Sequence, residues 1–258
     1  MNIDGHHMKK ETERICRADH TLYQIALFQS VAQGEYYGVI SVGKFKQHGD
    51  FGMGIFESVN GELIMLDGVV YQALYDGTIA IPSDDYMIPY GNAAFFESDI
   101  EGGRISAGSV TELQKILNED ITEKYGRNQF YFAKIHGDFP YVAVRSELKQ
   151  EEPFKMLNIA LKTDQRKYEY ENIKGTIVGL FCPAYMNSMN APGWHFHFIS
   201  DDKTKGGHMT EAALKNCRLQ VHKMSRFIAE LPDSETFNSK DLGIDVMSAI
   251  REAEKGDF

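Results

Sequence analysis

The sequence predicts a mixed α/β protein that is rich in strands, with mostly antiparallel sheets and a few helices. Two Asp-Gly pairs, at 67–68 and 76–77, separate runs of Val, Ile, Leu and Tyr. Asp-Gly between such runs is a strong hairpin signal, because both turn positions tolerate a positive φ. The connections between the expected elements are short and rich in turn residues, which favours antiparallel pairing.

The first half of the chain is expected to contain a short helix followed mainly by strands. Residues 22–33 are expected to form the helix, ending near Gly34, and residues 38–45 a strand. The glycine-rich residues 49–54 favour a loop. Residues 62–81, with their two Asp-Gly turns, predict a meander of three strands.

A second helix is predicted over residues 109–121. Ser109 can cap its first turn, and Glu112 follows three residues later, as in a capping box. One apolar face of this helix is formed by Leu113, Ile116 and Leu117. We place a domain boundary near this helix, which gives an N-terminal β-sheet domain, 20–125, and a C-terminal β-rich domain, 126–258, with the candidate metal site.

The second half of the chain again alternates strand-like runs with turns. Residues 129–135 and 141–144 predict a hairpin around His136-Gly137-Asp138, and the charged residues 162–172 are expected to be exposed. Three further strands and a C-terminal amphipathic helix or tail are expected, in that order, at 175–182, 193–200, 218–224 and 241–255.

Size, charge and cysteine content exclude several classes of protein. The net charge of −10 over 258 residues argues against binding to a nucleic-acid backbone, which needs clustered Lys and Arg. No apolar run reaches the roughly 18 residues of a membrane-spanning helix, and residues 1–17 lack the apolar core of a signal peptide. The three cysteines are far apart and form no Cys-x-x-Cys pair, so we expect no disulfide framework and a cytoplasmic location.

The most informative segment is Gly193–Ser200, which has histidines at alternate positions. Alternate side chains of a strand share a face, so His195 and His197 are expected to point the same way. A polar turn that ends in Gly-Gly follows, and a returning strand would place His208 beside them. Three such imidazoles can occupy three corners of a tetrahedron at about 2.0–2.1 Å from Zn²⁺.

The fourth corner of this predicted site has no ligand nearby in the sequence. A three-histidine site normally keeps that position for water or substrate, which is typical of a catalytic metal. For any one histidine, a surface or core role in a hairpin is the commoner explanation. The combined pattern favours the metal, although it specifies a metal better than it specifies a reaction.

Four segments together resemble the bacterial alpha-acetolactate decarboxylases in sequence, order and spacing. They are HGDFGMG at 48–54, GELIMLDGVVYQ at 61–72, GWHFHF at 193–198 and GGH at 206–208. The resemblance extends from about Leu22 to the C-terminus. It implies a two-domain α/β protein that forms a homodimer through its N-terminal sheet. It also implies a zinc lyase that converts (S)-2-acetolactate to (R)-acetoin and CO₂, in the branch from pyruvate to acetoin and butanediol.

The resemblance also assigns site residues. It places the zinc ligands on His195, His197 and His208. The active-site arginine falls on Arg145, and the first acidic residue falls on Glu62. A second acidic residue comes from the C-terminal tail, where Glu254 fits best and Glu252 is the competing register. Without the resemblance, all four of these charged residues would be expected to be solvated or ion-paired.

The residues suit the chemistry of losing CO₂ from a β-keto acid. Two electrons must flow into the neighbouring ketone, and a Lewis acid can accept them. A planar, permanently charged guanidinium at Arg145 can orient the departing carboxylate with two hydrogen bonds. A carboxyl group at Glu62 or Glu254 can then protonate one face of the product.

The sequence departs from the family pattern at three places. Ile55 stands where a threonine is expected, Trp194 replaces a more usual tyrosine, and Val59-Asn60 replaces Leu-Asp. The first change removes a hydroxyl group from near the expected site, and none of the three is a metal ligand.

Two other classes of function remain open from the residues alone. One is a different metalloenzyme on a His-x-His β scaffold, such as a cupin-like dioxygenase or isomerase. Against it, no glutamate follows His197 within a few residues, as in many cupin sites. The other is a non-enzymatic module that binds a metal or a small molecule.

Overall fold

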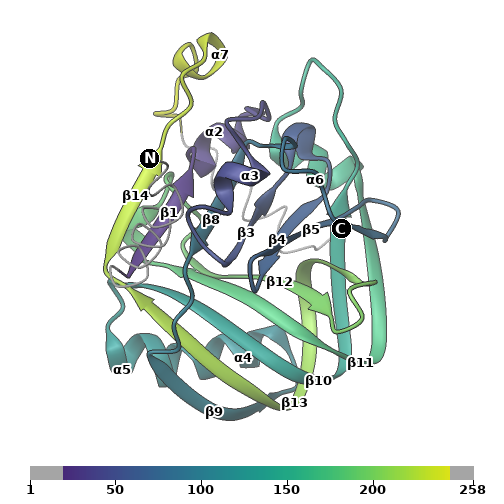
Figure 1. The fold of residues 1–258 in the computed structure, drawn as a ribbon, viewed down its shortest axis with the longest axis vertical. Coiled ribbons are helices and arrows are strands. Elements are labelled where there is room, and N and C mark those ends of the chain that lie inside the picture. Colours follow the sequence, from purple (N-terminus) through teal and green to yellow (C-terminus); the bar gives the residue numbers. More distant parts are fainter. Residues whose placement is uncertain (1–19, 245–258) are drawn as a thin grey trace, which may run out of the picture.

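The computed structural model describes residues 20–244 and contains two main sheets (Figure 1). The first has seven strands in the order β14 (Arg226–Glu230), β1 (Thr21–Ile25), β8 (Tyr90–Ala94), β3 (Phe51–Ile55), β4 (Glu62–Leu66), β5 (Val69–Ala73) and β6 (Ile79–Ala80). The second has five strands in the order β10 (Phe130–Glu147), β11 (Gln165–Cys182), β12 (Gly193–Ser200), β13 (Gly206–Met224) and β9 (Ile100–Ala107). A small third sheet pairs β2 (Ile40–Ser41) with β7 (Met87–Ile88).

The helices are short and lie at the two ends of the molecule (Figure 1). They are α2 (Phe28–Ala32), α3 (Val42–Phe45), α4 (Val110–Leu117), α5 (Glu123–Tyr125), α6 (Leu157–Thr163) and α7 (Glu235–Asn238), with 3-10 helices at η1 (Glu57–Val59) and η3 (Ala184–Met186) and a π-helix at η2 (Asn118–Thr122). Among the described strand pairs β1–β14 is parallel and the others are antiparallel. The predicted strand-rich α/β class with mostly antiparallel sheets is therefore confirmed.

The five-stranded sheet closes on itself. The long strand β10 pairs with β11 along one edge and with β13 along the other, and β12 joins β11 to β13. Strands β10 to β13 therefore form a ring, and β9 is added outside it on β13. Closing a sheet satisfies the backbone groups that an open edge would leave exposed.

Several predicted elements are confirmed. The meander over 62–81 is present as the antiparallel strands β4, β5 and β6. The predicted Ser109 cap is present at the start of α4, where the Glu112 amide donates to the Ser109 hydroxyl at 3.1 Å, while the Glu112 side chain accepts from the Gly108 amide at 2.7 Å. The strands at 175–182, 193–200 and 218–224 are present within β11, β12 and β13. The predicted C-terminal helix or tail, 241–255, lies largely outside the described residues.

Two early predictions were wrong in part. The expected helix over 22–33 is divided into strand β1 and helix α2, since the buried run from Leu22 to Ile25 lies between β14 and β8 inside the sheet. A short apolar run is compatible with a buried strand or a helix, and here the neighbouring strands decide. The expected strand over 38–45 becomes β2 and then α3, whose first turn is capped by the Ser41 side chain.

The glycine-rich residues 49–54 were predicted as a loop, but they contain strand β3. A side chain at Gly52 would put its Cβ 2.3 Å from the carbonyl oxygen of Asn92, and one at Gly54 would meet the carbonyl oxygen of Tyr90 at the same distance. The glycines therefore allow β3 to approach β8 closely, which is a role of glycine inside strands.

The predicted hairpin at 129–144 was also wrong, because β10 runs without a turn from Phe130 to Glu147. His136-Gly137-Asp138 forms an irregularity in the β10–β13 register instead. Such a bulge bends a strand and changes its twist without ending it. The charged residues after 162 form the end of α6 and the mostly exposed first half of β11.

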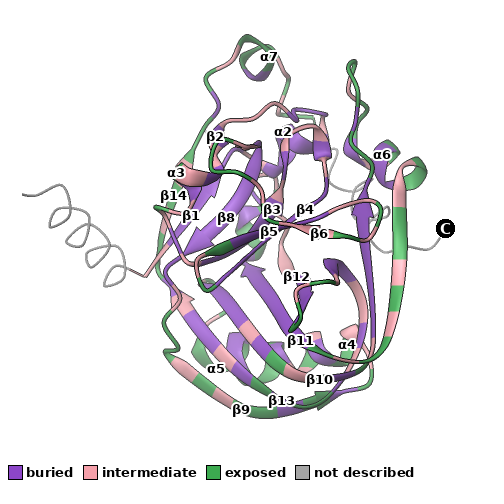
Figure 2. Cartoon of the chain, turned by 45° about the vertical axis from the view of Figure 1, so that its right-hand side comes forward, coloured by how far each residue is buried: buried purple, intermediate pink, exposed green. Residues whose placement is uncertain are grey.

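The seven-stranded sheet is buried on both faces, so it separates two apolar cores. All five residues of β4 are buried (Figure 2). Leu63 and Met65 pack toward the core around α2 and α6. Ile64 and Leu66 pack on the other face against the ring, where they meet Val178 of β11. A third core fills the inside of the ring, under α4.

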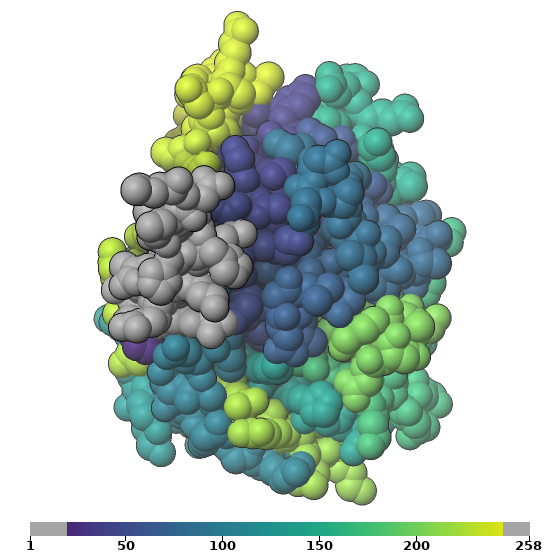
Figure 3. Space-filling view, in the orientation of Figure 1, coloured from purple at the N-terminus to yellow at the C-terminus, as the bar shows by residue number. Residues whose placement is uncertain are grey.

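The two halves of the chain exchange strands. β9 precedes residue 125 but pairs with β13 of the ring, and β14 follows it but pairs with β1 of the seven-stranded sheet. The turn after β12 (light green) lies beside the surface of β4 to β6 (blue) in Figure 3, with the Lys203 ammonium 5.9 Å from the Tyr71 ring centre. The division into domains 20–125 and 126–258 stays a prediction.

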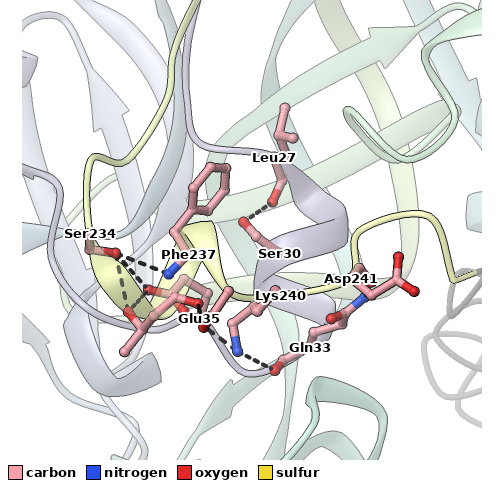
Figure 4. A network of polar contacts seen from close by, with 10 residues as sticks. Leu27, Ser30, Gln33, Glu35, Ser234, Phe237, Lys240 and Asp241 are labelled. Atoms are coloured by element: carbon pink, nitrogen blue, oxygen red, sulfur yellow. Dashed lines mark hydrogen bonds and ion pairs between the residues drawn. The ribbon is translucent and has the colours of Figure 1, made fainter.

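Hydrogen bonds and an ion pair connect the segment after β14 to α2 and to the turn that follows α2 (Figure 4). Glu35 accepts a hydrogen bond from the Thr236 hydroxyl at 2.7 Å and lies 3.5 Å from the Lys240 ammonium. Gln33 donates to the backbone carbonyl of Asp241 at 2.7 Å. These contacts hold α7 and the residues after it against the helix that also lines the candidate site.

Within residues 20–244, no helix is both long enough and apolar enough to cross a membrane.

Candidate metal centre

The three histidines singled out from the sequence meet in the structure. His195 and His197 lie on one face of β12, and His208 on β13 is the direct cross-strand partner of His197. The Nε2 atoms of His195 and His197 are 3.3 Å apart. One nitrogen from each of the three rings lies within 4.8 Å of the others. The predicted hairpin and its convergence of three imidazoles are both present.

Hydrogen bonding fixes the tautomer of the central histidine. His197 Nδ1 lies 2.8 Å from the backbone carbonyl oxygen of Leu63. A carbonyl oxygen only accepts, so Nδ1 carries the proton and Nε2 keeps its lone pair directed at the neighbouring rings. A hydrogen bond of this kind from the other ring nitrogen is usual for metal-binding histidines, because it orients the ring.

All three imidazoles are held in the neutral form. Burial, and then the positive charge of Arg145, lower the pKa of His195 to about 4. Burial, and then the charge of Arg145, also lowers the pKa of His208 well below its usual value. Burial lowers the pKa of His197 in the same way. Neutral imidazoles offer the lone pairs that a metal needs.

The spacing suits a tetrahedral metal. Two ligand atoms that are each about 2.05 Å from Zn²⁺ at a tetrahedral angle are about 3.3 Å apart, which is the separation of the His195 and His197 nitrogens. The residues present therefore fit a divalent cation held by three histidines.

A second cluster in the described residues does not fit a metal. His20, Asp99 and His222 also bring ligand atoms within 4.8 Å of one another. However, His222 Nδ1 accepts a hydrogen bond from the Glu97 amide at 2.7 Å, so its proton is on Nε2. Neither nitrogen of this ring then has a lone pair free for a cation.

The buried histidines are expected to make the stability of the metal-free protein depend on pH. Burial lowers the pKa of His222, like that of His195, to about 4 from an ordinary value of 6.5. Between these values the unfolded chain binds protons that the folded chain does not, so stability falls as the pH falls. Each such group lowers the free energy of unfolding by up to about 1.4 kcal/mol for every pH unit. Below about pH 4 the histidine is protonated in both states, and this dependence on pH ends. Urea unfolding at pH 7.5, 6 and 5 measures this, and a flat free energy of unfolding would contradict it.

Two charged side chains stand beside the histidines. Glu62 begins β4, is only 4% exposed, and places Oε2 3.3 Å from His197 Nε2. Arg145 lies on β10 directly across from His208 and is 2% exposed. The histidines and Arg145 come from the ring, and Glu62 comes from the seven-stranded sheet. The site therefore forms where the two sheets meet.

A pocket opens onto these groups. Its polar lining consists of His195, His197, His208, Glu62, Arg145, Glu147, Asn92 and Asn190. Its apolar wall includes Phe28 and Val31 of α2 and Leu157 and Leu161 of α6. A pocket that joins a metal-binding corner, a guanidinium and a carboxylate to an apolar wall suits a small carboxylate-bearing substrate.

Comparison with known families agrees with this geometry. The family model for alpha-acetolactate decarboxylase matches residues 22–244. The chain belongs to the alpha-acetolactate decarboxylase family. The predicted resemblance and the prediction of a lyase are both confirmed.

Relatives and solved structures extend the match along most of the chain. An alpha-acetolactate decarboxylase of Methanosarcina mazei is 34% identical over 92% of this chain and 81% of its own length. One from Lactococcus lactis subsp. lactis is 33% identical over 88% of this chain and 94% of its own length. The crystal structure of alpha-acetolactate decarboxylase from Bacillus subtilis strain 168 is 29% identical, covers 92% of this chain and 99% of its own, and has a TM-score of 0.85.

The departures from the family pattern lie in different places. Ile55 and Val59 line the pocket, so the lost threonine hydroxyl is replaced there by apolar surface. Trp194 points away from the histidines, since its ring stacks on Phe196 and its Nε1 donates to Asn118 at 3.1 Å. This tryptophan belongs to the packing of the ring.

Two predicted acidic residues lie outside the described part of the chain, and three further residues of the pocket were not predicted. Glu254 and the competing Glu252 lie outside the described residues. Glu147, Asn92 and Asn190 line the pocket but were not expected from the sequence. Strand alternation gives a signal for Glu147, because it lies two residues after Arg145 and must share its face. No motif marks the two asparagines, which are brought in by β8 and by the segment before β12.

Proposed function

We propose that this chain decarboxylates (S)-2-acetolactate to (R)-acetoin and CO₂ with zinc bound by His195, His197 and His208. The observation that carries the proposal is the convergence of three neutral imidazoles, Arg145 and Glu62 on one pocket. Membership of the alpha-acetolactate decarboxylase family supports the choice of substrate. When bound, zinc supplies a Lewis acid that draws electrons into the ketone as the C–C bond breaks.

Arg145 binds and orients the carboxylate that leaves. Its side chain is buried, and its Nη1 forms no hydrogen bond within the described residues. A buried guanidinium with donors unused favours a planar anion as its partner. The carboxylate leaves as neutral CO₂, and the bonding electrons stay on the substrate.

Glu62 supplies the proton that replaces CO₂. Its carboxyl group is buried next to His197, on the side of the site that the seven-stranded sheet provides. A proton donor fixed on one side of the substrate gives one enantiomer of the product. Glu254 is the second acidic residue in this proposal, with Glu252 as the competing assignment, and both lie outside the described residues.

The context of the enzyme forms part of the proposal. Family membership supports a cytoplasmic homodimer, with contacts through the N-terminal sheet, in the branch that leads to acetoin and butanediol. Light scattering on the purified protein tests the dimer. The expected mass is twice that of the 29.2 kDa chain.

Replacing Arg145 with lysine is expected to lower kcat/KM for acetolactate about 100-fold while the zinc content stays unchanged. Lysine keeps the charge but loses the planar pair of donors that fixes a carboxylate. Steady-state kinetics with metal analysis measures both quantities. Arg104→Lys, on the exposed strand β9, is the matched control, and an unchanged kcat/KM in Arg145→Lys would exclude the assigned role.

Metal analysis paired with an acetoin assay tests the proposed function directly. We expect about one zinc per chain, and both CO₂ and acetoin from racemic acetolactate. Zinc-loaded protein that releases neither product would overturn the proposal. Iron in the purified protein, or a requirement for oxygen, would instead favour a cupin-like oxygenase.

A further inference from the structure

A second charged residue shares the pocket wall with Arg145. Glu147 lies two residues further along β10, and the two side chains therefore lie on the same face of the strand. Each is 2% exposed, and Arg145 Nε is 3.6 Å from Glu147 Oε1. The pocket thus contains a buried ion pair, close to the histidines, in addition to Glu62.

The hydrogen-bonding capacity of this pair is unused within the described residues. Neither oxygen of Glu147 accepts a hydrogen bond there, and the buried Tyr36 hydroxyl also forms none. Burial, and then the negative charge of Glu147, raise the pKa of Tyr36. Buried polar groups are normally satisfied, so the unused hydrogen-bonding groups of Arg145 and Glu147, which line the pocket, point to a ligand there.

The backbone around Glu147 is fixed. The Ser146 hydroxyl donates to the carbonyl oxygen of Ala73 at 2.6 Å, which ties β10 to the end of β5. The Gln150 amide donates to the carbonyl oxygen of Ser58 at 2.7 Å. Because both sides of Glu147 are anchored, its carboxylate is kept beside the guanidinium.

The reaction explains why an arginine in this pocket needs a counter-charge. The substrate carboxylate carries a full negative charge before the reaction and loses it as CO₂ departs. A guanidinium that binds this carboxylate tightly stabilises the substrate more than the transition state, which raises the barrier. A carboxylate held on another edge of the same guanidinium weakens that binding by repulsion.

We propose that Glu147 is a positioning residue that holds the Nε edge of Arg145 and weakens its attraction for the substrate carboxylate. Arg145 then orients this carboxylate without binding it so tightly that the loss of CO₂ is slowed. The inference rests on the proposed function, since it requires a substrate that loses a carboxylate bound at Arg145.

Kinetics of Glu147→Gln give the first test. Glutamine keeps the shape and an oxygen that can lie beside Nε, but it removes the negative charge. We expect KM and kcat for acetolactate to fall together by about tenfold, with kcat/KM nearly unchanged, because the substrate is bound more tightly and the transition state is not. A merely structural role predicts the opposite split, with a higher KM and a lower kcat/KM.

Binding of two unreactive probes to the zinc-loaded protein gives a test that needs no turnover. 2-Hydroxyisobutyrate has the hydroxyl and carboxylate groups, and 3-hydroxy-3-methylbutan-2-one has the hydroxyl and ketone groups without a charge. By calorimetry, Glu147→Gln is expected to bind the carboxylate about tenfold more tightly and the neutral hydroxyketone with unchanged affinity. Equal or weaker binding of the carboxylate would overturn the proposal.

Two further variants test whether the change in affinity comes from the charge of Glu147. Glu147→Asp keeps the charge, so its ratio of affinities for the carboxylate probe and the neutral probe should equal that of the unaltered protein. A ratio like that of Glu147→Gln would contradict the electrostatic explanation. Glu35→Gln makes the same change in a buried carboxylate outside the pocket lining, paired with Lys240, and should leave the ratio unaltered.

The binding test also separates this inference from the proposed function. If the probes behave as expected but acetolactate is not decarboxylated, the proposed reaction fails while the electrostatic role of Glu147 stands. If acetolactate is decarboxylated but the affinity ratio does not change in Glu147→Gln, the role of Glu147 fails alone.

Discussion

Replacing His197 with alanine is expected to remove the bound metal and to lower kcat/KM by at least about 1000-fold. His197 is the middle of the site, with its Nε2 3.3 Å from both the His195 nitrogen and a Glu62 oxygen. Its loss leaves only two imidazoles, too few for the three-ligand arrangement of catalytic zinc. Metal content by mass spectrometry and acetoin formation should decline together.

The matched control is His136→Ala. His136 lies on β10, is more than half exposed, and pairs with Asp201 on the surface. Its removal should change neither zinc content nor rate. A His197→Ala protein that keeps one zinc per chain would show that the metal is held elsewhere, and the proposed centre would then have to be abandoned.

Replacing Glu62 with glutamine is expected to preserve the metal but to lower kcat by about 10²–10⁴-fold, the usual contribution of a general acid. Glutamine has nearly the same shape and can occupy the same buried position beside His197, but its amide is far too weak an acid to donate a proton. The zinc content should therefore match that of the unaltered protein.

The stereochemistry of the product adds a second measurement for Glu62. If this residue delivers the proton, the slow residual reaction of Glu62→Gln should give acetoin with reduced enantiomeric excess, because solvent can protonate either face. Glu101→Gln, an exposed glutamate of β9, is the control. Full turnover in Glu62→Gln would remove this residue from catalysis.

Local sequence patterns predicted those parts of the molecule whose structure depends on near neighbours. Asp-Gly turns fix the register of adjacent strands, and the meander from β4 to β6 followed from them. The alternation of His195 and His197, with a Gly-Gly turn before His208, was enough to predict that the three rings meet. In each case the partners are close in sequence, so the chain has few alternatives.

The predictions that were wrong concern segments whose structure is decided by distant residues. Leu22–Ile25 is a strand because β14 and β8, both far along the chain, enclose it. Gly52 and Gly54 suggest a loop until β8 is placed beside them. His136-Gly137-Asp138 has the composition of a turn, but pairing with both β11 and β13 keeps β10 extended through it.

The wall of the pocket was the least predictable part of the site. Phe28 of α2, Leu157 of α6 and Asn190 come from segments that share no motif, and only the packing of the two sheets brings them together. Glu62 looked like an exposed residue at the start of a hairpin strand. It is buried because the ring covers that face of the seven-stranded sheet.

The exchange of β9 and β14 between the two sheets affects how the protein unfolds. Each half of the chain adds an edge strand to a sheet that belongs mainly to the other, so the two sheets are expected to unfold together. Interlocked units of this kind are expected to melt cooperatively, in a single calorimetric transition. For protein engineering, a break near residue 125 would leave two fragments that each lack an edge strand, so such fragments should regain activity only when they are refolded together.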